Sequence, residues 1–253
     1  MSPDSTPLRV LQISDTHLFA DPAATLYGVN TRETLQRLLD KAVRQPRPDL
    51  VLATGDLVHD QPAAYPVLAE MLRQLGAPVA AIAGNHDDAG ELRAIQDSGL
   101  YVGGMQRLDG WRILLLNTQE TGKVSGHLSQ SELTLLRDGL RTAGDDHVLI
   151  ALHHHPVPLH SAWLDRIALD NSDEFFNILD CSANVRGVIW GHVHQEFDVV
   201  RRGVRLLATP STCVQFLPRS QDFAVDGKPP GMRWLSLNTD GRIETEVHWL
   251  EKR

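Results

Sequence analysis

A short aliphatic run that stops at a glycine and an aspartate most constrains what this chain can fold into. Residues 50–53 are aliphatic or β-branched without polar alternation, which predicts a buried strand. Gly55 lets the backbone turn tightly after it, so Asp56 is expected at the carboxyl end of that strand, where open α/β sheets place their ligands. A single Gly-Asp after a strand is a weak signal, because ordinary turns use the same residues.

Four further apolar runs end in the same kinds of side chain. The polar residues at these ends are Asp15 and His17, then Asn85 and His86, then His153, His154 and His155, and finally His192 and His194. Each set alone also fits a turn or a solvated edge. If the strands are parallel neighbours, all five sets converge on one rim of a sheet, and we expect one joint site there.

The chemistry of these side chains predicts two divalent metal ions. Imidazole and carboxylate ligands without a thiolate suit Zn, Mn, Fe or Co in an open, catalytic site. Seven ligands are too many for one ion with open positions, whereas two ions that share a carboxylate account for them. Asp56 is the expected bridge, because a carboxylate has two oxygens and its strand would lie between the two ligand sets. In such sites the ions lie about 3.5–4 Å apart and hold a bridging hydroxide that attacks phosphorus in line.

Strands and helices are predicted to alternate along most of the chain, which indicates a parallel sheet with right-handed crossovers. The expected strands are residues 8–13, 50–53, 78–83, 111–117, 147–152 and 185–190, and the expected helices are 31–45, 64–75, one from Asp88, one capped by Ser129, and 175–179. Two hairpins, 197–208 and 232–249, follow and predict a C-terminal antiparallel part that packs as a second sheet on the first. Residues 218–231 are expected to form an irregular loop within a single domain spanning 1–253.

The charge and cysteine content limit the partners and the compartment. The formal net charge is −8, which argues against a surface for nucleic acid or for an anionic membrane. An anionic substrate would then need local positive charge, which metal ions supply. Cys181 and Cys213 indicate no disulfide framework, and the sequence shows neither a signal peptide nor an apolar run that spans a bilayer. We expect a cytoplasmic protein, and the sequence leaves open a monomer or a homodimer.

The five motifs resemble, in this order, those of the calcineurin-like metallophosphoesterases. They read Asp-x-His, Gly-Asp, Gly-Asn-His-Asp, His-His-x-Pro and Gly-His-x-His, and the resemblance extends from about residue 8 to 250. Residues 12–20, 26–31, 153–165 and 206–216 make the chain most similar to the class III cyclic nucleotide phosphodiesterases. This resemblance implies an α/β fold, a four-layer α-β-β-α sandwich with two mixed sheets flanked by helices. It also implies hydrolysis of 3′,5′-cyclic AMP to AMP.

The resemblance also implies a role for each site residue. Asp15, His17, Asp56 and His194 would hold the first ion, and Asp56, Asn85, His153 and His192 the second. His86 would protonate the leaving 3′-oxygen or stabilise the charged phosphorane, so His86 and Asp56 are the implied catalytic residues. The implied substrate-binding residues are His17, Asp56, Asn85, His86, His153 and His194. Fe and Mn are the expected ions, with Zn, Co and Mg as alternatives.

One ligand is ambiguous, because His155 stands where the family has a proline. Alignment through Pro156, Pro158 and Asp165 selects His153 as the ligand, with His154 as the alternative.

Other functions fit parts of the pattern. A broader phosphodiesterase or phosphomonoesterase would use the same metal site with different loops around it. A nuclease is disfavoured by the acidic charge, and a protein phosphatase by Gly-Asp-Leu-Val-His-Asp in place of Gly-Asp-x-x-Asp-Arg-Gly. A metal-dependent scaffold would not need the spare proton donor His86.

Overall fold

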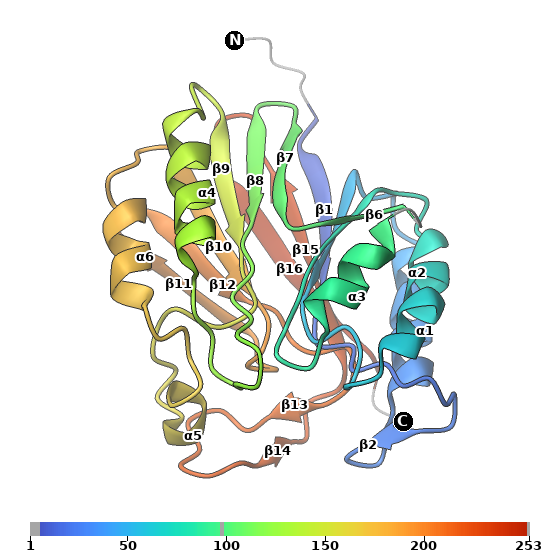
Figure 1. The fold of residues 1–253 in the computed structure, drawn as a ribbon. Coiled ribbons are helices and arrows are strands. Elements are labelled where there is room, and N and C mark those ends of the chain that lie inside the picture. The colour runs from blue at the N-terminus through green and yellow to red at the C-terminus, as the bar shows by residue number, and fades with distance from the viewer. Residues whose placement is uncertain (1–5, 97–98, 252–253) are drawn as a thin grey trace.

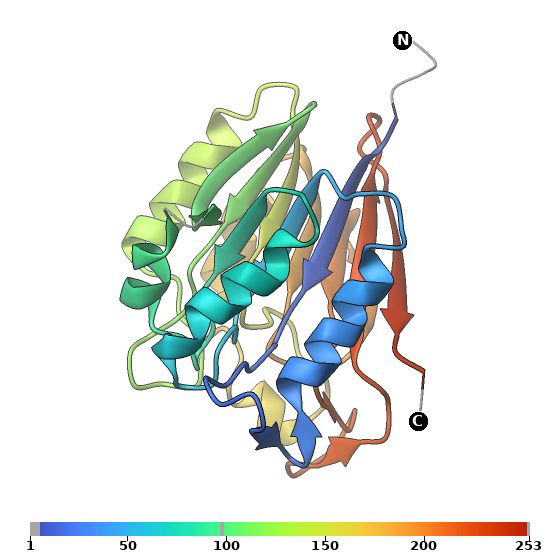
Figure 2. The ribbon, with the colours of Figure 1, turned by 90° about the vertical axis from the view of Figure 1, so that its right-hand side faces the viewer.

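The computed structural model describes residues 6–96 and 99–251, which form two six-stranded mixed sheets with helices on their outer faces (Figures 1 and 2). The first sheet has the order β16 (Ile243–Trp249), β15 (Gly231–Leu237), β1 (Leu8–Ile13), β4 (Leu50–Thr54), β5 (Val79–Ile82) and β6 (Leu100–Val102). The second has the order β11 (Phe197–Arg201), β12 (Val204–Ala208), β10 (Val185–Trp190), β9 (His147–Ala151), β8 (Trp111–Leu115) and β7 (Gly104–Leu108). The layers confirm the predicted α-β-β-α sandwich.

Three apolar clusters fill the spaces between these layers. One packs helices α1 (Thr31–Ala42) and α2 (Tyr65–Arg73) on the first sheet, as the turned view shows (Figure 2). A second lies between the sheets and joins Leu52 of β4 to Trp111 and Ile189 of the second sheet. A third packs α4 (Gln130–Arg141) and α6 (Ser172–Leu179) on the second sheet. Because both sheets are covered on both faces, most residues of their central strands are apolar, as in β4 and β5.

The parallel strands are divided between the two sheets, which corrects the expectation of one common rim. β1, β4 and β5 are parallel neighbours in the first sheet, and β8, β9 and β10 in the second. The two sets of carboxyl ends meet at the same end of the sandwich, where the buried side chain of Gln12 donates to the carbonyl of Trp190 over 3.2 Å. The motifs therefore converge from two sheets, because the apolar runs show where each strand ends and not which sheet holds it.

The C-terminal hairpins are also placed differently from the prediction. Both are antiparallel, as expected. However, the hairpin β15–β16 extends the first sheet through β1, and only β11–β12 belongs to the second. The chain thus returns to its first sheet after completing the second.

The helix ends follow their caps. Asn30 accepts a hydrogen bond from the Glu33 amide and starts α1, Asp88 caps α3 (Ala89–Ala94), and Ser129 caps α4. Helix α1 ends at Ala42, three residues before the predicted end. The segment expected as one helix at 64–75 is a 3₁₀ turn, η1 (Pro62–Ala64), followed by α2, and α6 begins three residues before its predicted start.

Short elements near the carboxyl ends of the strands were not predicted. They are β2 (Thr25–Leu26), β3 (Val29–Asn30), α5 (Ala162–Asp165), β13 (Gln215–Phe216) and β14 (Val225–Asp226). β14 pairs with β13 inside the segment predicted as an irregular loop. None of the helices in residues 6–96 and 99–251 has the length and apolarity that crossing a bilayer requires.

Candidate metal centre

The predicted metal ligands lie where the parallel strands of the two sheets end. Asp15 and His17 follow β1, Asp56 follows β4, Asn85 follows β5, His153 follows β9, and His192 and His194 follow β10. All are buried except Asn85, which is half-buried. Several of these side chains have nitrogen and oxygen atoms close enough together to hold an ion, in the groups Asp15–His17–His194 and Asp15–Asp56–His153.

Five of these residues have a left-handed backbone, which non-glycine residues seldom adopt. Their φ angles lie between 41° and 66° at Asp15, His17, Asp56, His192 and His194. The backbone thus turns sharply where it leaves each of these strands. Such conformations cost about 1–3 kcal/mol each and persist where the surroundings impose them, typically at functional sites.

The carboxylate of Asp56 faces two different histidines with its two oxygens. Oδ2 lies 3.7 Å from Nε2 of His17, and Oδ1 lies 3.4 Å from Nε2 of His153. Oδ1 also accepts a hydrogen bond from the backbone amide of His86 over 2.9 Å, which fixes the carboxylate plane. Asp56 therefore lies between the two predicted ligand sets, as a bridging carboxylate must.

Asp15, His17 and His194 form the group on one side of Asp56. Nε2 of His194 lies 3.4 Å from Oδ1 of Asp15 and 3.2 Å from Nε2 of His17. Nδ1 of His194 donates to the carbonyl of Val214 over 2.8 Å, so Nε2 carries a lone pair and faces the group. Fixing the tautomer through the other ring nitrogen is the usual way to orient a metal-ligating histidine.

His153 and His192 lie on the other side, with ring centres 5.1 Å apart, and Asn85 is the third predicted ligand of this set. Nδ1 of His153 donates to the carbonyl of Thr54 over 2.8 Å, and Nε2 of His192 donates to that of Ile167 over 3.1 Å. Nε2 of His153 and Oδ1 of Asn85 are both buried and have no hydrogen-bond partner among the described residues. Because buried polar atoms are nearly always satisfied, these two atoms fit ligands of a metal ion.

The three consecutive histidines have different surroundings. His154 uses both ring nitrogens within the protein, Nδ1 with the hydroxyl of Thr118 at 2.8 Å and Nε2 with the carbonyl of Val124 at 3.1 Å. His155 is buried with neither ring nitrogen hydrogen-bonded among the described residues, and burial lowers its pKa to about 4. Only His153 has a free nitrogen directed at Asp56.

The charges of the site are set by burial and by the Asp56–His153 pair. Burial opposes charge on both, but their mutual attraction dominates: the pKa of His153 rises to about 9, and that of Asp56 falls well below its usual range. Burial lowers the pKa values of His17 and His192 well below the usual value. His17 and His192 are therefore neutral beside the ionised carboxylate of Asp56, whereas an ion bound at His153 would displace its proton.

Three glycines leave room for this arrangement. A Cβ atom on Gly55 would overlap the ring of His153, one on Gly84 would overlap Asp56, and one on Gly191 would overlap Ser14. Each glycine directly precedes a predicted ligand in sequence. Any larger residue would therefore push these side chains out of position.

Two residues beside the candidate ligands, His59 and Asp60, were not predicted as site residues from the sequence. His59 places its Nδ1 3.0 Å from Nδ1 of His17 and stacks on the half-buried ring of His86, with ring centres 4.6 Å apart. Asp60 accepts a hydrogen bond from Nδ1 of His86 at 3.1–3.2 Å. Their only sequence signal was their place three and four residues after Asp56.

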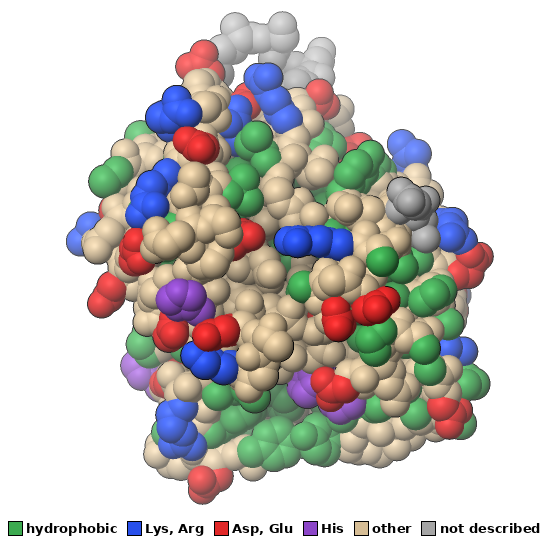
Figure 3. Space-filling view, in the orientation of Figure 1, with side chains coloured by type: hydrophobic (Ala, Val, Ile, Leu, Met, Phe, Trp, Pro, Cys, Tyr) green, Lys and Arg blue, Asp and Glu red, His purple; other side chains and the backbone are tan. Residues whose placement is uncertain are grey.

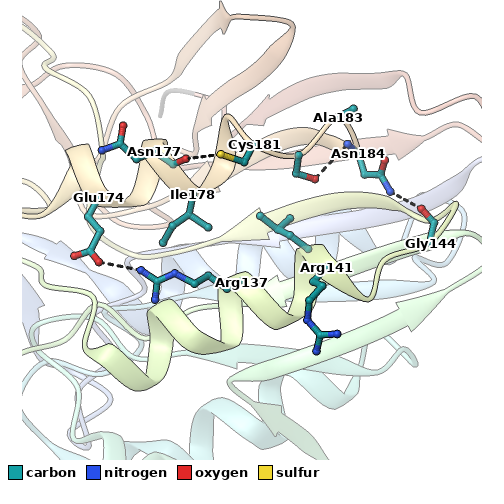
Figure 4. A pocket seen from close by; sticks show the side chains of 11 residues that line it. Arg137, Arg141, Gly144, Glu174, Asn177, Ile178, Cys181, Ala183 and Asn184 are labelled. Carbon is teal, nitrogen blue, oxygen red and sulfur yellow. Dashed lines mark hydrogen bonds and ion pairs between the residues drawn. The ribbon is translucent and has the colours of Figure 1, made fainter.

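A groove of about 710 Å³ lies elsewhere, between α4 and α6 (Figure 4). It reaches Gly144 and Asn184, which precede β9 and β10, so it is at the opposite end of the strands from the candidate ligands. Its Arg137 is paired with Glu174 at 3.1 Å, and Cys181 contacts the Asn177 carbonyl. It shares no residue with the metal centre.

A family model described as calcineurin-like phosphoesterase matches residues 8–196, which include every motif above. The chain belongs to this family. As a calcineurin-like phosphoesterase it shares its fold with a dimetal phosphatase from Danio rerio, whose crystal structure covers 96% of this chain and 99% of its own, with a TM-score of 0.70 at 15% sequence identity.

Two bacterial relatives cover almost the whole of this calcineurin-like phosphoesterase. The 3′,5′-cyclic adenosine monophosphate phosphodiesterase CpdA of Pseudomonas aeruginosa is 41% identical over 240 residues, 94% of this chain and 88% of that protein. The protein of the same name from Escherichia coli K12 is 44% identical over 253 residues, 96% of this chain and 90% of that protein.

Proposed function

We propose that the protein is a dimetal phosphodiesterase that hydrolyses 3′,5′-cyclic AMP to AMP and so lowers cellular cyclic AMP. The observation that carries the proposal is the meeting of two ligand sets at the two oxygens of Asp56. The substrate follows from relatives named for this activity that are 41% and 44% identical over most of the chain. We further propose a cytoplasmic enzyme, monomeric or homodimeric, that does not bind nucleic acid and does not insert stably into a membrane.

Two ions would share the ligands at Asp56. Asp15, His17, Asp56 and His194 would hold one, and Asp56, Asn85, His153 and His192 the other. The free nitrogens of His194 and His153, together with the unpaired oxygen of Asn85, support this division. Imidazole, carboxylate and amide donors without thiolate fit Fe or Mn, and Zn, Co or Mg are the alternatives.

Ions bound here would supply Lewis-acid polarisation of the phosphate and an activated water at neutral pH. The side chains of the site would bind and orient the phosphate. His17, Asp56, Asn85, His86, His153 and His194 line the space into which the phosphate would fit. The backbone amide of His86 keeps the carboxylate of Asp56 in one orientation, so that both of its oxygens stay directed at the two ligand sets.

His86 is placed to move a proton to the leaving group. Its Nδ1 donates to the exposed carboxylate of Asp60, which orients the ring and leaves Nε2 for the substrate. Stacking on His59 restrains the ring further. A ribose 3′-alkoxide is a poor leaving group, so protonation at the 3′-oxygen lowers the barrier to its departure.

The proposal is tested with protein of known metal content and a panel of cyclic nucleotides. We expect 5′-AMP from cyclic AMP, and loss of the activity when a chelator removes the ions. Hydrolysis of an aryl phosphodiester without turnover of cyclic AMP would replace the substrate assignment by the broader phosphoesterase. Absence of hydrolysis of any ester by metal-replete protein would support a metal-dependent scaffold instead.

A further inference from the structure

Four aromatic side chains form a continuous rim beside the metal centre, which we call the aromatic rim: Tyr27, Trp163, Phe216 and Phe223. They come from four separate segments, the β2–β3 turn, α5, β13 and the loop after β13. All four segments lie at the end of the sandwich where the parallel strands finish (Figure 1). Hydrophobic side chains gather at this lower edge of the molecule, over α5, β13 and β14 (Figure 3).

The aromatic rim is joined directly to a candidate metal ligand. The ring of Phe216 stacks on that of His194, with centres 3.9 Å apart and planes at 10°. Phe223 lies 5.4 Å from Phe216, and Tyr27 lies 5.2 Å from Phe223. The rim thus leads in ring-to-ring steps from the site of the phosphate toward solvent.

The two outer rings are exposed, whereas the two inner rings hold the rim in place. Tyr27 and Phe223 are 59% and 45% exposed, and Phe216 and Trp163 are half-buried. Trp163 contacts both phenylalanines edge-on, at 5.1 Å and 5.3 Å. Two neighbouring exposed aromatic side chains beside the candidate metal centre are typical of a ligand surface.

The backbone of Tyr27 gives independent support. Tyr27 and Gly28 are the two central residues between β2 and β3, and both have positive φ, 47° and 80°. A turn of this kind favours asparagine, aspartate or glycine at its first central position, so tyrosine there costs stability. An exposed ring on a strained turn points to a purpose other than folding.

We propose that the aromatic rim binds the base of the nucleotide, with the purine stacked on Phe223 and Tyr27; this rests on the proposed function. The ribose separates phosphate from base, and the steps from His194 through Phe216 to Phe223 are on that scale. Stacking reads the face of the base and not its edge. The rim therefore favours large bases over small ones and discriminates weakly between adenine and guanine.

The test uses Phe223→Leu, which keeps apolar packing without an aromatic face, and Tyr27→Asn, which suits the turn. Tyr101→Ala is the matched control, because Tyr101 is 52% exposed on β6, away from the site. Stacking of one base is worth about 1–3 kcal/mol. We therefore expect each rim variant to raise KM for cyclic AMP about tenfold, with kcat changed less than about twofold. Tyr27→Asn should at the same time raise the melting temperature.

A base-free substrate separates this proposal from the proposed function. A ribose 3′,5′-cyclic phosphate that carries a methoxy group in place of the base should be hydrolysed equally by wild type and rim variants. Equal KM values for cyclic AMP in wild type and variants, or equal losses on both substrates, would overturn the rim assignment. If wild type hydrolyses no cyclic nucleotide, calorimetric binding of AMP against ribose 5-phosphate decides: the rim predicts tighter AMP binding that both variants weaken, and equal binding refutes it.

Discussion

His153 directs its Nε2 at Oδ1 of Asp56, 3.4 Å away, while its Nδ1 is held by the carbonyl of Thr54. A histidine that follows β9 of the second sheet thereby contacts a carboxylate that follows β4 of the first sheet. Both groups are buried, and each shifts the pKa of the other toward its charged form. Burying two charged groups is costly, and a metal ion bound by both would replace the proton of His153 and relieve that cost.

The three histidines after β9 should differ in their effect on metal content. His153→Ala should remove the second ion, because His153 alone has a free nitrogen facing Asp56. His155→Ala should leave both ions bound, and His154→Ala should lower stability through the lost contacts with Thr118 and Val124. Metal analysis of the purified variants distinguishes them. If His154→Ala were the variant that lost an ion while His153→Ala kept both, the register would be wrong.

Metal-free protein should lose stability as the pH rises toward 9. The pKa of His153 is raised from 6.5 to about 9 in the folded state, so the folded state binds more protons than the unfolded state between these values. The stabilisation is therefore full below about 6.5 and declines through 9. Thermal melts of chelator-treated protein from pH 6 to 10 measure it, with His153→Gln as the reference. Parallel pH profiles of the two proteins would refute the raised pKa.

The importance of His86 should depend on the leaving group. General acid catalysis contributes about 10²–10⁴-fold, so His86→Ala should lose about that factor on cyclic AMP. A nitrophenolate leaves without a proton, and the same variant should lose much less on an aryl phosphodiester. Both ions should stay bound, which metal analysis checks. Equal losses on the two substrates would mean that His86 positions phosphate or metal and is not the acid.

Asp87 should be essential for the loop that carries Asn85 and His86. Its buried carboxylate accepts hydrogen bonds from the amides of Leu57, Val58 and Gly84 and from the hydroxyl of Tyr65. Asp87→Asn replaces an acceptor by a donor and leaves amides unpaired, at about 1–3 kcal/mol. Denaturant unfolding measures the loss, and Asp222→Asn, at an exposed position, is the control. Equal stability of the two variants would contradict this account.

The position of the candidate ligands could be predicted because these side chains directly follow aliphatic strands in the sequence. Asp15, Asp56, Asn85 and His194 each follow an aliphatic run, and a run shows where its strand stops. The division of these strands between two sheets could not be predicted, because an apolar run buried on both faces looks the same in either sheet.

The contacts that support the candidate ligands could not be predicted from the sequence either. The link between His59 and His17, and the stacking of Phe216 on His194, depend on loops whose course has no periodic pattern. β13 and β14 have two residues each, too few for any alternation to show. Short pairings of this kind are decided by tertiary packing.

The central claim is that Asp56 joins two ions into one site for phosphodiester hydrolysis, and the metal content of Asp56→Asn tests it most directly. Wild-type protein should hold two ions, and Asn85→Ala, which removes a ligand of only one, should keep the other. Asp56→Asn should lose ions from both positions together with nearly all activity on cyclic AMP. Full occupancy of two ions in Asp56→Asn, measured by metal analysis, would contradict the account.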